Sequence, residues 1–190
     1  MQFQNDINFL FEIGTLRRTA RTWNQFFGND VANVAEHTIR MSRIAMILAK
    51  HEWVTNLWHI LKLVLVHDVG EIRSTDLHYF SKQYVVRNEE KAIQDTFGKV
   101  NIGEEFIALW HEAEARDTIE SKIMKDADTL DPDFEIMEKL YDGFKIAEIR
   151  KEDRLNRINA TLFTETAKKL QREIYESNPH EWHLLASMKK

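Results

Sequence analysis

The sequence of 190 residues contains no cysteine. This absence excludes a disulfide framework, a thiolate nucleophile and any zinc or iron–sulfur site built on thiolates. An excess of basic residues is also missing, because 26 lysines and arginines stand against 31 aspartates and glutamates, for a net charge of −5. Since duplex nucleic acid calls for a basic surface, we expect no nucleic-acid partner.

Long apolar runs are missing as well. The most apolar run, residues 61–66, is far shorter than the roughly 20 residues that a membrane-spanning helix needs. The N-terminal stretch also lacks the pattern of a secretory signal peptide. We therefore expect a cytoplasmic protein without a membrane partner.

Glycine and proline are scarce, with 6 and 2 copies. A sheet-rich fold needs a turn about every 8 to 12 residues, and turns are built mainly from these residue types. The sequence therefore favours long helices joined by polar loops, in a single all-α domain over residues 1–190. Hydrophobic spacing predicts about six or seven helices.

The predicted helices follow from apolar residues spaced three or four positions apart. The first ends near Gly14, and a nearly all-apolar helix from about residue 55 to 68 is expected to be the buried central one. Pro132 predicts a kink or a break in the helix that contains it. The other predicted helices occupy the segments around residues 39–48, 86–97, 104–115, 121–141 and 154–177. The last helix is expected to pack on a core of about residues 5–140 or to lie at a dimer interface.

Several polar residues stand out against their apolar surroundings. Taken alone, His67 is explained as a histidine at a helix C-terminus, where the helix dipole favours it. Asp68 is explained as a capping aspartate. His37, on an otherwise apolar or basic helix face, fits a hydrogen-bonded core histidine. Asp126 and Asp128 lie among apolar neighbours, where aspartate is rarely buried without a partner. Whichever of these two aspartates faces the core therefore needs a cation.

In this order, His37, the pair His67 and Asp68, and Asp128 resemble the four-part signature of the HD-domain metal-dependent phosphohydrolases. The resemblance implies that these residues bind one divalent metal ion per chain. Two imidazoles and two carboxylates suit Mn²⁺, Co²⁺, Ni²⁺, Fe²⁺ or Zn²⁺, with Mg²⁺ a further candidate, and leave positions open for water and substrate. Asp128 is favoured over Asp126 because it stands at the family's position, and Asp126 would point about 200° away around the helix.

The similarity is closer to the branch of this family that contains the 5′-deoxynucleotidases, and it covers about residues 5–140. Two departures are visible. The glycine that the branch has between Thr22 and Trp23 is absent, and Asp131-Pro132-Asp133 follows the last ligand. The segments that carry the closer similarity are residues 16–23, 34–37, 67–71, 109–115 and 122–128.

The resemblance implies an all-α HD-domain helical bundle that forms a homodimer. It also implies a phosphomonoesterase that removes the 5′-phosphate of nucleoside or deoxynucleoside monophosphates. Two alternatives remain open at this point. One is a phosphodiesterase or another nucleotide hydrolase on the same metal site, and the other is a catalytically silent nucleotide-binding or scaffold protein.

Roles for five further residues follow from the same resemblance. Glu71 lies one helical turn beyond the histidine–aspartate pair and would donate or accept a proton. Asp76 would orient water or substrate from the loop that follows. Arg21 aligns with a phosphate-contacting arginine and Trp23 with the aromatic residue beside it, while Arg18 is a further candidate for substrate binding. Arginines near a cation site would repel it unless an anion lay between them, which fits a phosphoryl substrate.

Overall fold

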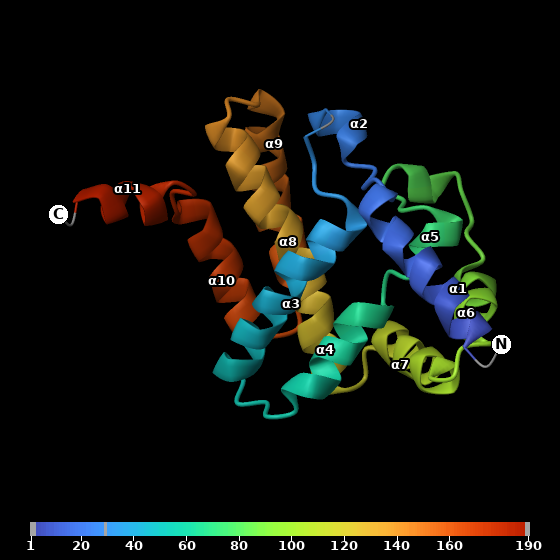
Figure 1. Ribbon diagram of the computed structural model, residues 1–190. Coiled ribbons are helices and arrows are strands. Elements are labelled where there is room, and N and C mark those ends of the chain that lie inside the picture. Colours follow the sequence, from blue (N-terminus) through green and yellow to red (C-terminus); the bar gives the residue numbers. More distant parts are fainter. Residues whose placement is uncertain (1–2, 29, 189–190) are drawn as a thin grey trace.

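The computed structural model describes residues 3–28 and 30–188, and these segments are built from helices (Figure 1). Within them, extended backbone pairing is limited to a single bridge between Ala20 and Asn33. The α-helices are α1 (Gln4–Ile13), α2 (Asn24–Phe27), α3 (Val34–His51), α4 (Leu57–Val66), α5 (Glu71–Ser74), α6 (Glu89–Phe97), α7 (Gly103–Ala115), α8 (Ile119–Tyr141), α9 (Lys145–Asp153), α10 (Glu165–Glu176) and α11 (Glu181–Met188). Shorter turns of other helix types are η1 (Gly14–Arg18), η2 (Ser81–Gln83), η3 (Arg154–Ile158) and η4 (Asn159–Thr161).

The predicted all-α class is correct for the described residues, but about six or seven helices is too low a number. The α-helices of the described segments run from α1 to α11. Two of the additional helices, α2 and α5, have four residues each. A helix of one turn is too short to leave an apolar period in the sequence, so spacing could not reveal it.

Helix α8 forms the centre of the molecule and packs against α3, α4, α7, α9 and α10. The hydrophobic core lies between these helices. Met41 and Leu48 of α3, Leu63 of α4, and Ile123 and Leu130 of α8 are fully buried there. Burial of a side chain of this size contributes about 1.5–3 kcal/mol. The packing of α3 and α4 on α8 fixes the three segments that carry the candidate ligands.

Helix α4 is not the buried central helix that its sequence predicted. Its inner face is buried, but Trp58 is 66% exposed and Leu65 is 56% exposed. Although α4 is almost entirely apolar, it is therefore not buried on all sides. It leaves an apolar surface without a partner in the described part of the chain.

The start of α3 is fixed by a capping box. The backbone N–H of Glu36 donates to Oδ1 of Asn33 at 3.0 Å, and the backbone N–H of Asn33 donates to Oε2 of Glu36 at 3.0 Å. Thr118 caps α8 with its side-chain oxygen. Such caps satisfy backbone N–H groups that the first helical turn leaves unpaired. They therefore fix where the helices begin and which residues face the core.

Pro132 does not break its helix, because α8 continues from Ile119 to Tyr141 with the proline inside it. A proline removes one backbone N–H and crowds the preceding turn. In that turn, the carbonyl of Thr129 accepts a hydrogen bond from the guanidinium of Arg154. This contact links α8 beside the proline to the segment that follows α9.

The single helix predicted over residues 154–177 is wrong. The chain passes through the turns η3 and η4, becomes extended at Leu162 and begins α10 only after Thr164. Asp126 causes this break, since its carboxylate accepts hydrogen bonds from the backbone N–H groups of Phe163 at 2.7 Å and Thr164 at 2.8 Å. Helix α10 then packs against α8 and α3.

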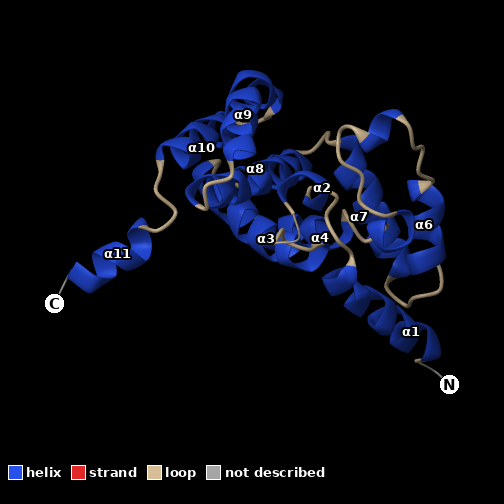
Figure 2. Cartoon of the chain, turned by 90° about the horizontal axis from the view of Figure 1, so that it is seen from above, coloured by secondary structure: helices blue, strands red, loops and turns tan. Residues whose placement is uncertain are grey.

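The outline of the molecule is a compact body from which α11 projects at the C-terminal end, as both ribbon views show (Figures 1 and 2). Among the described residues, no helix is both long and apolar enough to cross a bilayer.

Candidate metal centre

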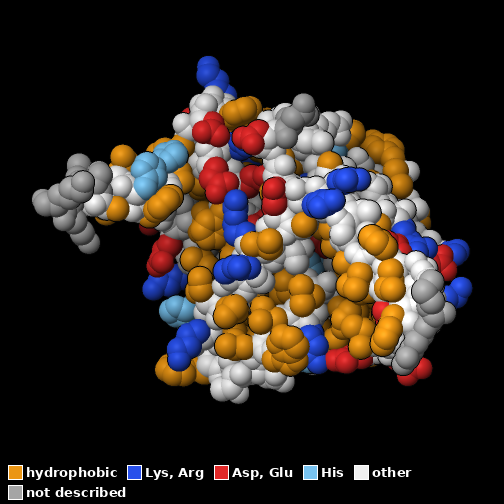
Figure 3. All heavy atoms as spheres, viewed as in Figure 1, with side chains coloured by type: hydrophobic (Ala, Val, Ile, Leu, Met, Phe, Trp, Pro, Cys, Tyr) orange, Lys and Arg blue, Asp and Glu red, His pale blue; other side chains and the backbone are white. Residues whose placement is uncertain are grey.

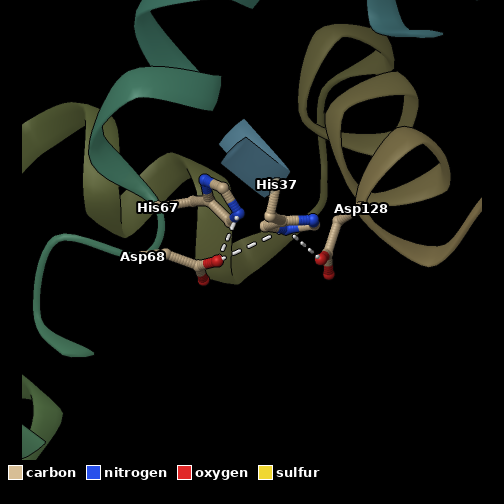
Figure 4. Close-up of side chains that lie close together, drawn as sticks. All are labelled: His37, His67, Asp68 and Asp128. Atoms are coloured by element: carbon tan, nitrogen blue, oxygen red, sulfur yellow. Dashed lines mark ion pairs between the residues drawn. The ribbon is translucent and has the colours of Figure 1, made fainter. Parts of the chain in front are cut away.

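Four candidate ligands from three separate helical segments meet at one point (Figure 4). His37 lies on α3, His67 and Asp68 directly follow α4, and Asp128 lies on α8. One ligand atom of each residue lies within 4.8 Å of the others. Nε2 of His37 is 3.2 Å from Oδ1 of Asp128 and 3.5 Å from Oδ2 of Asp68. Nε2 of His67 is 3.0 Å from the same Oδ2 of Asp68.

The second nitrogen of each histidine fixes which ring atom faces the centre. Nδ1 of His67 lies 2.7 Å from the carbonyl oxygen of Val64, which can only accept a hydrogen bond. Nδ1 of His37 lies 2.6 Å from Oδ2 of Asp131. Both Nδ1 atoms therefore carry a proton, and each Nε2 is the atom that can bind either a proton or a metal.

The two Nε2 atoms are buried and have no aligned hydrogen-bond partner. Buried polar atoms are nearly always satisfied, so an unsatisfied pair that faces two carboxylates needs an explanation. A cation bound between the four residues would supply it. Two imidazole nitrogens and two carboxylates are donors that divalent transition metals accept. The residues present thus fit a divalent metal ion.

In the metal-free protein, electrostatic coupling holds Asp128 ionised and the two histidines protonated. Burial and Arg21 lower the pKa of His37, but the carboxylates of Asp128, Asp131 and Asp68 beside its ring outweigh them and raise that pKa well above 6.5. Burial raises the pKa of Asp128, but Lys125 and the two histidines outweigh it and hold that pKa well below 3.8. In the absence of a metal, protons on the histidines thus provide the positive charge that the carboxylates require.

Asp131 is a site residue that the sequence interpretation missed. Its Oδ2 accepts the hydrogen bond from His37 and lies 3.3 Å from NH1 of Arg21. Its Oδ1 lies 3.6 Å from Nε of Arg40. Asp131 follows Asp128 by three positions, so both face the same side of α8. That spacing could have indicated that Asp131 contacts His37. The sequence analysis instead treated Asp131 only as part of a departure from the family pattern.

Asp126 points away from the candidate metal centre. Its side chain is fully buried, and its carboxylate accepts the two backbone hydrogen bonds at Phe163 and Thr164 as well as one from Oγ1 of Thr164. The structure thus brings Asp128, and not Asp126, to the other three residues. The 200° rotation expected between the two positions explains the separation.

Glu71 begins α5 and lines the cavity beside Asp68. Burial, with the nearby charges of Asp68 and Asp76, raises the pKa of Glu71 to about 9 although Arg87 opposes the shift. Glu71 therefore carries a proton near neutral pH in the metal-free protein. Asp76 accepts hydrogen bonds from the backbone N–H of Thr22 at 2.8 Å and from its hydroxyl at 3.2 Å.

The three predicted substrate-binding residues lie in different environments. Arg21 is buried, lines the cavity and is held by Asp131. Trp23 also lines the cavity, with its ring 5.0 Å from the guanidinium of Arg150. Arg18, in contrast, is exposed on η1 and is not among the residues that line the cavity. The structure thus brings Arg21 and Trp23 to the site and leaves Arg18 outside it.

The cavity next to the ligands has a volume of about 550 Å³. This is within the range of about 300–1,000 Å³ that small-molecule sites occupy. Its wall carries several basic side chains in addition to Arg21, and these are Lys82, Arg87, Arg116, Lys125, Arg150, Arg154 and Arg157. Acidic side chains line the cavity as well, and they are Asp68, Glu71, Asp76, Glu89, Glu114, Asp128 and Asp153. A small molecule with anionic groups fits this wall where its arginines lie beside the candidate metal centre.

Comparison with known proteins gives the class to which this fold and site belong. A family model described as HD domain matches residues 13–171, so the chain belongs to the HD-domain family. The 5′-deoxynucleotidase HDDC2 of Danio rerio is 31% identical over 135 residues, which cover 67% of this chain and 66% of that protein. The match thus spans slightly less than two thirds of this relative.

Solved structures support the same fold. A conserved hypothetical protein from Pyrococcus furiosus superposes with a TM-score of 0.75 at 24% identity, covering 90% of this chain and 99% of that chain. A protein described as a predicted metal-dependent phosphohydrolase from Magnetospirillum magnetotacticum MS-1 has a TM-score of 0.68 at 24% identity, covering 90% and 92%.

Proposed function

We propose that this protein is a metal-dependent phosphomonoesterase that removes the 5′-phosphate from nucleoside and deoxynucleoside monophosphates. The observation that carries the proposal is the pair of buried histidine Nε2 atoms that face Asp68 and Asp128 beside a cavity lined by Arg21. Membership of the HD-domain family and the similarity to a protein named 5′-deoxynucleotidase support it.

His37, His67, Asp68 and Asp128 would hold one divalent ion in this proposal. When bound, such an ion makes water a better nucleophile and offsets the charge of phosphoryl oxygens. The donor set suits Mn²⁺, Co²⁺, Ni²⁺, Fe²⁺ or Zn²⁺, and Mg²⁺ remains a candidate. The protein's own contribution is to keep both Nε2 atoms directed at the site through the bonds from Nδ1 to Val64 and Asp131.

Arg21 would bind the phosphate of the substrate. Its guanidinium is oriented by Asp131, lines the cavity and offers a planar set of donors that matches phosphate oxygens. Trp23 would lie against the nucleoside at the same wall. A dianionic monoester phosphate gains more from this arginine than a diester, which carries one negative charge fewer.

Glu71 would donate a proton to the 5′-oxygen as it leaves phosphorus. Its raised pKa keeps the carboxyl protonated near neutral pH, as a general acid requires. A bound cation nearby would lower this pKa and bring it closer to neutrality. Asp76, fixed by Thr22, would orient water or substrate from the loop that follows α5.

Release of inorganic phosphate tests the proposal. The purified protein is assayed on a panel of ribo- and deoxyribonucleoside 5′-monophosphates with Mn²⁺, Co²⁺ or Mg²⁺, and on cyclic diesters under the same conditions. We expect metal-dependent release from monoesters and little from diesters. Equal rates on diesters would indicate a phosphodiesterase. Metal and nucleotide binding without any release would indicate a catalytically silent binding protein.

We also propose that the protein forms a homodimer. Hydrophobic side chains gather over α1, α3 and α4 on the face shown in Figure 3, and this supports a second copy as the partner. The exposed hydrophobic residues of these three helices include Leu10, Phe11, Ile39, Met46, Ile47, Trp58 and Leu65. An apolar face of this kind is typical of a protein–protein contact.

A further inference from the structure

Arg87 lies in the loop between η2 and α6, yet its side chain is only 10% exposed. NH1 donates to Oε1 of Glu71 at 3.2 Å and to the carbonyl oxygen of Thr75 at 2.7 Å. NH2 lies 2.6 Å from Oε1 of Glu89. Arginine is rarely this buried unless it is paired, and here one guanidinium connects α5, the turn that follows it and the start of α6.

The turn that Arg87 contacts has a strained backbone. Thr75 has φ +61° and ψ 152°, a conformation that residues with a β-carbon rarely adopt. Its backbone N–H donates to the carbonyl of Glu71 at 2.9 Å, while its own carbonyl accepts from Arg87. Such strain persists only where surrounding contacts impose it. Arg87 supplies one of those contacts.

The same turn delivers Asp76 to the cavity. Asp76 directly follows Thr75, and Thr22 holds its carboxylate from the other side. Glu71 at the beginning of the turn and Asp76 after it therefore depend on one short segment. That segment is fixed at one end by Arg87 and at the other by Thr22.

We propose that Arg87 is a positioning residue that holds Glu71 and the strained turn at Thr75, so that Glu71 and Asp76 face the substrate. This inference rests on the proposed function, in which Glu71 transfers the proton. Arg87 lines the cavity, but its NH1 and NH2 atoms are engaged by Glu71, Thr75 and Glu89, so it acts through Glu71 and the turn and not through contact with the substrate. Its loss therefore changes the rate of the chemical step and leaves substrate binding largely intact.

A double-mutant cycle in kcat tests this inference. A misplaced catalytic group can cost about 10²-fold, so we expect Arg87→Gln to lower kcat by about that factor with little change in KM and in bound metal. Arg87→Lys keeps the charge but loses the planar pair of donors, and should restore part of the rate. In the Glu71→Gln background, measured in single turnovers at high enzyme concentration, Arg87→Gln should lower kcat by much less than in the wild type, because only the placement of Asp76 is then left to lose.

Arg73→Gln is the matched control, since Arg73 lies on α5 but donates to Glu12 and not to Glu71. It should leave kcat close to the wild-type value. Equal effects of Arg87→Gln in the wild-type and Glu71→Gln backgrounds would overturn the inference. A rise in KM with unchanged kcat would overturn it as well, because it would show that Arg87 binds the substrate.

A second measurement does not depend on activity. Hydrogen exchange of the backbone amides of residues 71–76 should become faster in Arg87→Gln or Arg87→Lys, while α3 and α8 keep their protection. Unchanged exchange in this turn would refute the positioning role even if the protein hydrolysed no nucleotide. Failure of wild-type protein to release phosphate refutes the proposed function instead, so the two failures are distinguishable.

Discussion

At the scale of single residues, Asp126 and Asp128 have different roles although they lie two positions apart on α8. Asp126 holds the backbone at Phe163 and Thr164, and Asp128 is a candidate metal ligand. We expect Asp128→Ala to lose the divalent metal and Asp126→Ala to retain it. Asp126→Ala should instead lower the free energy of unfolding, because each backbone donor left unpaired at Phe163 and Thr164 costs about 1–3 kcal/mol. Elemental analysis combined with urea unfolding measures both effects. Metal lost from Asp126→Ala but kept in Asp128→Ala would reverse the assignment.

Glu71→Gln tests the proposed acid with the smallest change in shape. The amide keeps size and hydrogen bonding but cannot deliver the proton, so turnover should fall by about 10²–10⁴-fold. Metal content should stay at the wild-type value, because Glu71 is outside the four-residue group. Steady-state kinetics and elemental analysis on the same preparation check this. Wild-type turnover in Glu71→Gln would place the acid elsewhere, with Asp76 as the next candidate.

What the sequence can predict at this scale depends on whether a residue acts through a family motif or through local packing. His37, His67, Asp68 and Asp128 were candidates because their order resembles a known signature, and the structure brings them together. Asp131 has no place in that signature. Its role depends on how α3 and α8 face each other, which a linear pattern does not contain.

At the scale of secondary-structure elements, the long helices could be predicted and the C-terminal segment could not. Helices α3, α6, α7 and α8 lie where apolar spacing placed them, because each buries a periodic face. The segment 154–177 has the same spacing, yet the contacts of Asp126 with residues 163 and 164 stop the helix. A tertiary hydrogen bond from a distant helix overrides local periodicity here.

Helix α10 should therefore depend on Thr164, which caps it and also donates to Asp126. Loss of a capping side chain typically costs about 0.5–2 kcal/mol, so we expect Thr164→Ala to lower the free energy of unfolding by that amount. Urea unfolding followed by circular dichroism measures it. Thr161→Ala is the matched control, because that exposed hydroxyl bonds only to the nearby carbonyl of Ile158. Equal losses in both variants would show that the cap has no special role.

At the scale of the whole molecule, the apolar face over α1, α3 and α4 predicts self-association. A charge placed on this face should separate the copies, because an unpaired carboxylate is costly to bury in an apolar contact. We expect wild type to sediment as a dimer and Leu65→Asp as a monomer. Ile149→Asp, which changes a residue of α9 that is 64% exposed against 56% for Leu65, should leave the dimer intact. A monomeric wild type at micromolar concentration would contradict the homodimer proposal.

The protonation of the candidate site should couple the stability of the whole molecule to pH and metal. In the metal-free protein the pKa values of His37, His67 and Glu71 are raised by folding, that of Glu71 to about 9. The folded state thus binds these protons more tightly than the unfolded state does. The stabilisation that these protons give the folded state is complete below the pKa values of the unfolded chain, about 4.5 for Glu71 and 6.5 for the histidines. It is lost as the pH rises through the pKa values of the folded protein.

The Tm of metal-free protein should therefore fall between about pH 5 and pH 9. Metal binding has the opposite dependence, because the histidines must release their protons first. The gap in Tm between metal-loaded and metal-free protein should widen over the same range. Thermal unfolding with either Mn²⁺ or a chelator at each pH measures both. Glu71→Gln should flatten the metal-free slope and still show the widening gap, since the histidines remain. A gap that stayed constant with pH would mean that the metal does not replace protons on His37 and His67.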